Sequence, residues 1–268
     1  MEKRAAIEKM KLYLLDMDGT LYLGDRLYPF TKDFLQEIRR TGGRYLFLTN
    51  NSSKSVEDYV EKLKRLGIEA TREDFLTSSQ ATAYYLKKHH PGKILYVCGT
   101  GSLKKELRDS GFAVTEDSGR AECIVMGFDT ELTFRKLEDV SRLLLTRDIP
   151  YIATNPDLVC PTEFGAVPDC GSVCMMIRNA TGKSPVVVGK PQPLMPQLAM
   201  EKWGVSPEQT CVIGDRIYTD VKSGLNAGAL GILVMSGETD AEILAASSDR
   251  PDLVFRDCGE ILGILRSL

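Results

Sequence analysis

The sequence is poor in histidine and lacks regular cysteine motifs. Of its 268 residues only two are histidines, the adjacent His89 and His90, so a histidine-based triad or metal site has almost nothing to be built from. The seven cysteines are scattered through apolar segments without a Cys-x-x-Cys motif, which argues against a zinc site and favours reduced thiols in a cytoplasm. Acid–base chemistry must therefore come from carboxylates or lysine.

Long apolar runs and a strong charge of one sign are also missing. No apolar run approaches the roughly 20 residues that cross a membrane. Residues 1–11 are charged and have no apolar centre, unlike a secretory signal. The formal net charge of −3 leaves no electrostatic footprint for nucleic acid. We expect a cytoplasmic protein with no membrane and no nucleic-acid partner.

Short apolar runs alternate with amphipathic stretches along the chain. Strands are predicted at residues 12–15, 44–48, 94–97, 123–126, 151–153, 186–188, 211–213, 231–235 and 253–255. Apolar residues at 56, 59, 60 and 63 predict a helix, with Ser55 as its cap and Gly67 at its end. A second helix is predicted between Pro193 and Gly204. This alternation predicts an α/β fold with a doubly wound parallel sheet.

The polar motifs divide the chain into two parts. They lie before about residue 80 and after about residue 183, whereas the middle has its own β/α alternation and few such motifs. We predict a core domain made of residues 1–80 and 184–268, with a second α/β domain, residues 81–183, inserted into it. The chain is long enough to give each domain a core.

The most informative motif is Asp-Met-Asp-Gly-Thr at 16–20, which directly follows an apolar strand. Strands normally exclude Asp and Gly, and burying a carboxylate is costly without compensation. Asp16 and Asp18 therefore indicate a compensating cation, most simply a divalent metal. A plain acidic turn is the alternative.

Polar residues follow three further strands. Thr49, Asn50 and Asn51 precede a capped helix, so hydroxyl, amide and backbone N–H groups there predict an anion site, the alternative being a polar loop with a cap. Lys190 stands between Gly and Pro at a strand end, where it can reach a phosphate or a carboxylate.

The third of these strands, 211–213, runs into Gly-Asp-Arg at 214–216 and Thr-Asp at 219–220. Carboxylates of Asp16 and Asp215 and the backbone carbonyl of Asp18 are suitable ligands for Mg²⁺. Arg216 has either a role in the site or an ordinary solvated position. Ligands bind at the carboxyl ends of parallel strands, so the motifs converge if strand 12–15 lies between strands 44–48 and 211–213.

With these motifs the sequence resembles the haloacid dehalogenase superfamily of phosphatases. The motifs occur in that family's order: Asp-x-Asp-Gly-Thr at 16–20, Thr-Asn at 49–50, Lys190, and Gly-Asp-x-x-x-Thr-Asp at 214–220. Thr-Asn-Asn at 49–51, Ala-Thr-Asn-Pro-Asp at 153–157 and Gly-Lys-Pro at 189–191 resemble its NagD-like, or p-nitrophenylphosphatase-like, group. The resemblance covers the whole chain and implies a Rossmann-like core with a large α/β (C2-type) cap.

The resemblance implies a role for each motif. Asp16 would be the nucleophile that forms an aspartyl-phosphate, and Asp18 the general acid and then the base. Thr49, Asn50 and Asn51 would bind the phosphoryl group.

The charged residues of the later motifs would complete the site. Lys190 and Mg²⁺ would neutralise the phosphoryl oxygens and the Asp16 carboxylate. Asp215 would hold the metal, together with Asp16 and the carbonyl of Asp18. Asp220 would orient Lys190 or support the metal through water.

The inserted domain is expected to recognise the leaving group and to exclude water. Asn155 and Asp157 are candidates for substrate contact, and a structural turn is the alternative because Asn-Pro-Asp is strong turn chemistry. Residues 160–171 are expected to be a loop rich in Pro and Gly. Interfaces between caps are common in this cap class, so the resemblance implies a homodimer through the cap.

The function predicted is Mg²⁺-dependent hydrolysis of small phosphate monoesters, with p-nitrophenyl phosphate as an artificial substrate. Sugar phosphates, nucleoside monophosphates, phosphoglycolate and pyridoxal phosphate all remain open. One alternative is a phosphoacceptor signalling module of the receiver type, against which Asp18 and the large insertion argue. The other is a non-catalytic interaction protein on a phosphatase fold, against which the intact set of charged residues argues.

Overall fold

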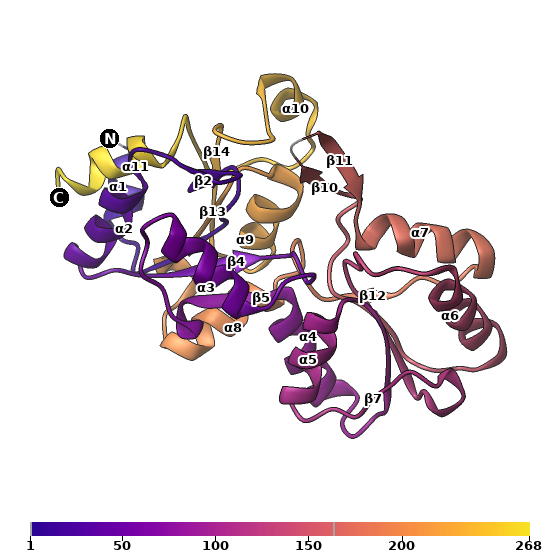
Figure 1. Cartoon of the computed structure of the whole chain (residues 1–268). Coiled ribbons are helices and arrows are strands. Elements are labelled where there is room, and N and C mark those ends of the chain that lie inside the picture. The colour runs from indigo at the N-terminus through magenta and orange to yellow at the C-terminus, as the bar shows by residue number, and fades with distance from the viewer. Residues whose placement is uncertain (1, 163) are drawn as a thin grey trace. The chain divides into compact units, whose positions relative to one another are not determined.

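The structure, a computed structural model, describes residues 2–162 and 164–268 (Figure 1). Met1, in the first expected core segment, and Glu163, in the expected insertion, lie outside the described residues. The chain forms two compact units. The first comprises Met1–Thr49, Val60–Leu76 and Lys190–Leu268, and the second comprises Asn50–Tyr59 and Thr77–Gly189. The main segment of the second unit, Thr77–Gly189, is thus a few residues longer at each end than the expected insertion of residues 81–183. The second unit also includes the separate segment Asn50–Tyr59.

A six-stranded sheet forms the centre of the first unit. Its order is β15 (Leu253–Phe255), β14 (Leu230–Val234), β13 (Thr210–Gly214), β1 (Leu12–Leu15), β4 (Arg44–Thr49) and β5 (Phe75–Thr77). β1 pairs in parallel with β13 on one side and with β4 on the other, so that Leu15 lies beside both Ile213 and Phe47. This is the strand order in which the predicted motifs converge.

Helices cover this sheet. They are α1 (Glu2–Glu8), α2 (Thr31–Arg40), α3 (Val56–Arg65), α8 (Leu194–Trp203), α9 (Lys222–Asn226), α10 (Ala241–Ala246) and α11 (Cys258–Leu265), with short helical turns at Arg72–Asp74, Pro207–Gln209 and Ile217–Val221. All four residues of β1 are buried, as expected for a parallel strand with helices on both faces. None of the helices in the described parts of the chain is long and apolar enough to cross a membrane.

Both predicted helices have the expected ends. At the start of α3 the backbone N–H of Ser55 donates to Asp58 at 2.8 Å, and the N–H of Asp58 donates to the Ser55 hydroxyl at 3.2 Å, which is a reciprocal cap. α8 begins after Pro193 and ends at Gly204, whose φ of 61° is the left-handed conformation that favours glycine.

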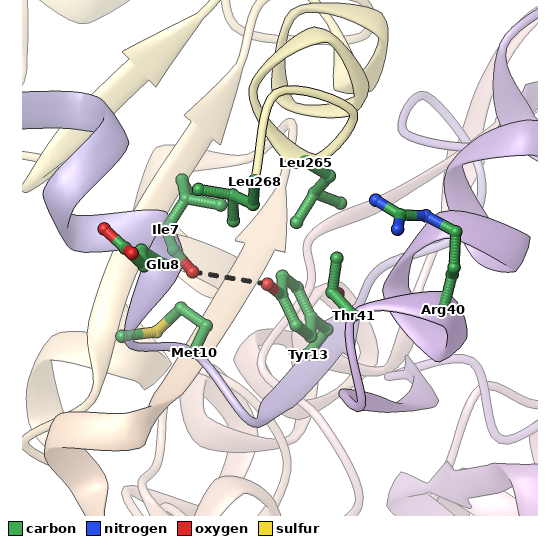
Figure 2. Close-up of a pocket in the computed structure, with 8 residues that line it drawn as sticks. All are labelled: Ile7, Glu8, Met10, Tyr13, Arg40, Thr41, Leu265 and Leu268. Atoms are coloured by element: carbon green, nitrogen blue, oxygen red, sulfur yellow. Dashed lines mark hydrogen bonds between the residues drawn. The ribbon is translucent and has the colours of Figure 1, made fainter.

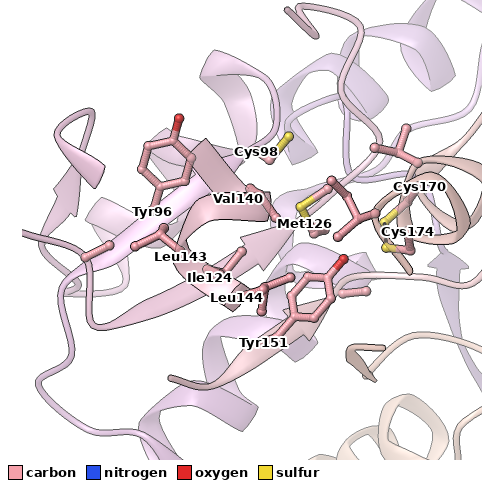
Figure 3. Packing of buried hydrophobic residues seen from close by; sticks show 14 residues of the cluster. Tyr96, Cys98, Ile124, Met126, Val140, Leu143, Leu144, Tyr151, Cys170 and Cys174 are labelled. Carbon is pink, nitrogen blue, oxygen red and sulfur yellow. Dashed lines mark hydrogen bonds between the residues drawn. The ribbon is translucent and has the colours of Figure 1, made fainter. Parts of the chain in front are cut away.

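The second unit has a five-stranded parallel sheet of its own. Its order is β12 (Val186–Val187), β9 (Tyr151–Ala153), β8 (Cys123–Met126), β6 (Leu95–Cys98) and β7 (Val114–Thr115), with α4 (Ser78–His89), α5 (Gly101–Asp109), α6 (Phe134–Thr146), α7 (Cys170–Thr181) and a turn at Ser118–Arg120. Figure 3 shows its core, in which Ile124 and Tyr151 of the sheet pack with Leu143 of α6 and Cys174 of α7. Cysteine acts here as a small apolar side chain.

The nine predicted strands are all present, with ends within one residue of those expected. The loop predicted at residues 160–171 is wrong, because β10 (Val159–Thr162) and β11 (Gly165–Pro168) form an antiparallel hairpin there. Their side chains are exposed or half-buried, so the apolar alternation that marks a strand is absent. The short hairpin of β2 (Tyr22–Leu23) and β3 (Arg26–Leu27) is a further addition.

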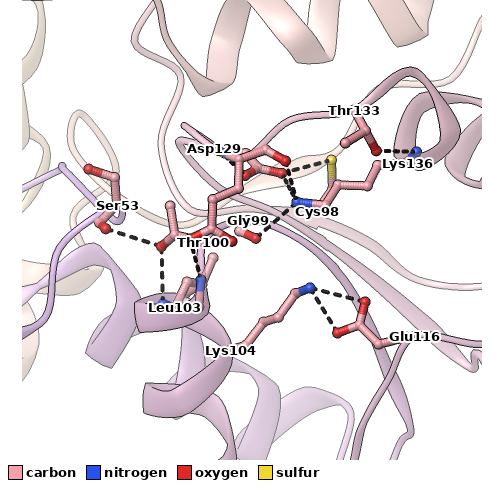
Figure 4. A network of polar contacts seen from close by, with 12 residues as sticks. Ser53, Cys98, Gly99, Thr100, Leu103, Lys104, Glu116, Asp129, Thr133 and Lys136 are labelled. Atoms are coloured by element: carbon pink, nitrogen blue, oxygen red, sulfur yellow. Dashed lines mark hydrogen bonds and ion pairs between the residues drawn. The ribbon is translucent and has the colours of Figure 1, made fainter.

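A buried ion pair lies at the carboxyl ends of β6 and β8 in the second unit (Figure 4). Lys136 lies 2.7 Å from Asp129, and their side chains are 14% and 1% exposed. Lys136 also donates to the carbonyl of Glu131 at 3.0 Å. Asp129 therefore depends on Lys136 for its compensation.

Replacing Lys136 by Met should lower the free energy of unfolding by about 3–5 kcal/mol, because it leaves a buried carboxylate without its cation. The matched control is Arg142→Met in the same helix, whose exposed pair with Glu138 should contribute less than about 1 kcal/mol. Urea unfolding measures both variants. Equal destabilisation by the two substitutions would contradict the prediction.

Candidate active site

Lys190 is the centre of a buried charge cluster in the first unit. Its Nζ lies 2.7 Å from Oδ1 of Asp16 and 2.5 Å from Oδ1 of Asp220, and it donates to the carbonyl of Leu48 at 3.5 Å. Its side chain is only 3% exposed. Asp16 directly continues β1, since its N–H donates to the carbonyl of Ile213 at 2.9 Å. The lysine therefore joins the ends of β1 and β4 to the turn that follows β13.

Asp215 adds a third carboxylate to this cluster. Oxygens of Asp16, Asp215 and Asp220 lie within 4.8 Å of one another. Oδ2 of Asp215 accepts from the backbone N–H of Glu238 at 2.7 Å, whereas its buried Oδ1 has no hydrogen-bond partner among the described residues. A buried carboxylate oxygen without a donor is costly, and it is a suitable ligand for a cation.

The space around Asp215 depends on two glycines. A Cβ built on Gly19 would lie 2.4 Å from Oδ2 of Asp215, and one built on Gly237 would lie 2.1 Å from the same atom. Gly19 also has a φ of 83°, which other residues rarely adopt. Only residues without a side chain let the backbone approach the carboxylate so closely.

The carboxylates outnumber the cations, and their pKa values reflect this. Burial, and then the neighbouring Asp220, raise the pKa of Asp16 to about 8, although Lys190 acts in the opposite direction. Burial and Asp220 also raise the pKa of Asp215 to about 6. Burial alone would lower the pKa of Lys190, but Asp16 and Asp220 outweigh it and raise that pKa. Three carboxylates beside one lysine fit a divalent cation with oxygen ligands.

Asp18 lies outside this cluster. Its side chain is 57% exposed, and Oδ1 accepts from the backbone N–H of Gly24 at 3.3 Å. Thr49, by contrast, is the buried last residue of β4. Of the predicted residues, the structure therefore brings Asp16, Lys190, Asp215 and Asp220 into contact or near contact, and leaves Asp18 toward solvent.

Four predicted residues belong to the second unit. The side-chain amide of Asn50 donates to Asp157 at 3.0 Å, and that of Asn155 donates to the carbonyl of Asn50 at 3.0 Å. Asn155 is fully buried and Asp157 nearly so. Asn51 accepts from the backbone N–H of Ser53 at 2.9 Å. These side chains fix the segment that follows Thr49.

Models of two families match the chain. The haloacid dehalogenase-like hydrolase model covers residues 13–113, and the HAD-hydrolase-like model covers residues 187–261. An acid sugar phosphatase of Staphylococcus aureus (strain USA300) is 32% identical over 97% of this chain and 99% of its own length. The chain belongs to the haloacid dehalogenase-like hydrolase family.

Solved structures of this family share the fold. A 4-nitrophenylphosphatase from Thermotoga maritima superposes with a TM-score of 0.92 at 40% identity, covering 96% of this chain and 98% of the other. NagD from E. coli K-12 gives a TM-score of 0.85 at 29% identity, covering 94% and 98%. The protein is therefore an enzyme of the phosphatase branch of the family, in the group of NagD and the p-nitrophenylphosphatases.

The loop at residues 236–239 of this phosphatase contacts the cluster and was not predicted from the sequence. The Ser236 hydroxyl donates to the carbonyl of Gly19 at 2.7 Å, and the Tyr28 hydroxyl donates to the carbonyl of Ser236 at 2.6 Å. Glu238 donates its N–H to Asp215 and forms an ion pair with Arg216 at 2.7 Å. Arg216 is thus paired rather than solvated. The position of this loop at the site could have been predicted from the sequence, because small polar residues follow β14 as they follow β1, β4 and β13.

A separate hollow of about 240 Å³ lies near the beginning of β1 (Figure 2). Tyr13 and Thr41 line it with Ile7, Met10 and Leu265, and the Tyr13 hydroxyl points to the carbonyl of Ile7 at 3.5 Å. The three clustered aspartates are not among its lining residues. The hollow is therefore separate from the carboxylate cluster at the carboxyl edge of the sheet.

Gly237→Ala should weaken the binding of a divalent cation at least about tenfold, because the new methyl group displaces the Asp215 carboxylate and disturbed support of a ligand costs that much. Gly263→Ala is the matched control, since no atom of residues 2–162 and 164–268 lies within 4 Å of its new Cβ, apart from its own helix backbone and chain neighbours. Titration calorimetry with Mg²⁺ measures both affinities. The prediction fails if Gly237→Ala binds the cation as tightly as Gly263→Ala does.

Proposed function

We propose that this phosphatase hydrolyses phosphate monoesters of small soluble metabolites with Mg²⁺ and a phosphorylated Asp16. The observation that carries the proposal is the position of Asp16 at the end of the central strand β1, in an ion pair with Lys190 and near Asp215. A carboxylate so placed is a nucleophile beside the cations that an anionic substrate requires.

The reaction has two steps. An oxygen of Asp16 attacks phosphorus, the bond from phosphorus to the leaving oxygen breaks, and Asp18 gives that oxygen its proton. Asp18 then takes a proton from water, which attacks phosphorus, breaks the bond to Asp16 and releases inorganic phosphate. The partial exposure of Asp18 supports this role, because the residue must exchange protons with water and with the leaving group.

Lys190 neutralises the Asp16 carboxylate and the phosphoryl oxygens, and Asp220 holds Lys190 in place. Asp16, Asp215 and the backbone carbonyl of Asp18 would hold Mg²⁺, which supplies electrostatic stabilisation of the transferring phosphoryl group. Thr49, Asn50 and Asn51 bind that group from the end of β4. The hydrogen bond from Asn50 to Asp157 supports a defined position for Asn50.

The first unit would be the core domain and the second unit the cap. Of the two roles open to Asn155 and Asp157, their burial and their bonds to Asn50 support the structural one. The exposed side chains of Phe134, Met175 and Met176 on the second unit support the expected homodimer through the cap.

For the substrate, the names of the relatives are the best guide. An acid sugar phosphatase and a 4-nitrophenylphosphatase resemble this chain over nearly its whole length. We therefore propose sugar phosphates as the natural class and p-nitrophenyl phosphate as an artificial substrate. Comparison of kcat/KM over a panel of sugar phosphates, nucleoside monophosphates, phosphoglycolate and pyridoxal phosphate tests this choice.

Asp16→Asn should abolish hydrolysis of p-nitrophenyl phosphate, because it removes the nucleophile. Asp33→Asn, at an exposed surface ion pair with Arg266, should leave the activity unchanged. Wild-type enzyme quenched in acid during turnover should carry phosphate on the peptide that contains Asp16. Full activity of Asp16→Asn would exclude the mechanism, and a stable phosphoprotein without phosphate release would favour a signalling module.

The affinity for Mg²⁺ should rise between pH 6 and pH 8. The raised pKa values of Asp16, about 8, and Asp215, about 6, mean that the cation-free site holds protons that a bound cation must displace. Calorimetry at pH 7 in buffers of different ionisation enthalpy should therefore detect proton release. Asp220→Asn removes a charge that raises both pKa values, so it should reduce this release. An affinity that is constant over this range would contradict the prediction.

A further inference from the structure

Helix α3 brings a lysine to the side chain of Asp18. Nζ of Lys62 lies 3.7 Å from Oδ2 of Asp18 and 4.2 Å from the centre of the Tyr22 ring. The Lys62 side chain is only 16% exposed, although its partner carboxylate is 57% exposed. A lysine on a helix surface is ordinarily solvated, so this half-buried position between a carboxylate and an aromatic ring needs a reason.

The ring beneath Lys62 belongs to the same turn as Asp18. Tyr22 is 2% exposed, and its carbonyl accepts the N–H of Gly19 at 2.7 Å. Asp18 and Tyr22 also form an isolated β-bridge. The ammonium group over the Tyr22 face is thus fixed relative to the backbone that carries Asp18.

The two oxygens of Asp18 are held by different partners. Oδ1 accepts from the backbone N–H of Gly24, within the turn, whereas Oδ2 faces Lys62 from a separate helix. An exposed aspartate otherwise samples several rotamers. Proton transfer requires the carboxylate within about 2.6–3.2 Å of the leaving oxygen, so restricting these rotamers raises the fraction of productive complexes.

We propose that Lys62 is a positioning residue that holds the Asp18 carboxylate for proton transfer to the leaving oxygen, an inference that rests on the acid–base role given to Asp18 above. Lys62 acts through Asp18 and needs no contact with the substrate. Tyr22 in turn orients Lys62.

This role predicts a dependence on the leaving group. When phosphorus transfers to Asp16, an alkyl leaving group departs as a strongly basic alkoxide unless Asp18 protonates it. 4-Nitrophenolate is stable as an anion and needs the proton less. Loss of Lys62 should therefore slow the cleavage of alkyl phosphates more than that of aryl phosphates.

The test compares Lys62→Met with Lys64→Met, which removes the same charge from an exposed position of the same helix. In Lys62→Met we expect kcat/KM for glycerol 2-phosphate to fall at least about tenfold further than kcat/KM for 4-nitrophenyl phosphate. This factor is a small part of a typical acid–base contribution to catalysis. Lys62→Arg should restore most of the loss. Equal falls for the two substrates, or the same pattern in Lys64→Met, would overturn the proposal.

A double-mutant cycle separates this inference from the proposed function. In an Asp18→Asn background, Lys62→Met should cause no further loss, because the residue that it positions is gone. If Asp18→Asn itself shows no preference for the aryl substrate, the role of Asp18 fails. If Asp18→Asn shows it and Lys62→Met does not, only the role of Lys62 fails. If Lys62→Met does not fold, Lys62→Gln is measured in the same way.

Discussion

The contact on which the site depends is the buried salt bridge from Lys190 to Asp16 and Asp220. A lysine that is 3% exposed is retained only because two carboxylates compensate its charge, and those carboxylates are tolerated only because the lysine lies between them. With Asp215 the balance is still negative, and this adds to burial in raising the pKa values of Asp16 and Asp215. The fold therefore keeps a site that a cation and an anionic substrate can complete together.

The sheet topology makes this cluster possible. Because β1 lies between β13 and β4, the residues after three strands end at the same edge of the sheet. Asp16 extends β1 and Asp215 directly follows β13, so the hydrogen bonds of the sheet restrict the backbone that carries each carboxylate. The loop at 236–239 adds a fourth segment, whose N–H groups face Asp215 where Gly237 leaves room. The strands thus determine where the carboxylates of Asp16 and Asp215 lie, and glycine lets the neighbouring backbone come close to Asp215.

Much of this could be predicted from the sequence, for a physical reason. Parallel strands buried on both faces are continuous apolar runs, so β1, β8 and β9 were predicted with their exact ends. The polar residues that follow β1, β4 and β13 marked the candidate site. The hairpin of β10 and β11 carries no such pattern. The pairing of Lys62 with Asp18 and of Arg216 with Glu238 was not predictable, because Lys62 and Glu238 lie outside the motifs and their own sequence neighbours are typical of ordinary solvated charges.

Asp16 and Asp18 are two residues apart and have opposite surroundings. Asp16 still belongs to the ladder of β1, and its carboxylate is enclosed with Lys190. Gly19 then turns the chain with a φ of 83°, and the Asp18 side chain is left largely in solvent. In the proposed mechanism the nucleophile must be held near the cations, whereas the proton carrier must reach both water and the leaving group. One strand end and one glycine turn provide these two environments, and under the same proposal Lys62 supports the exposed Asp18 carboxylate.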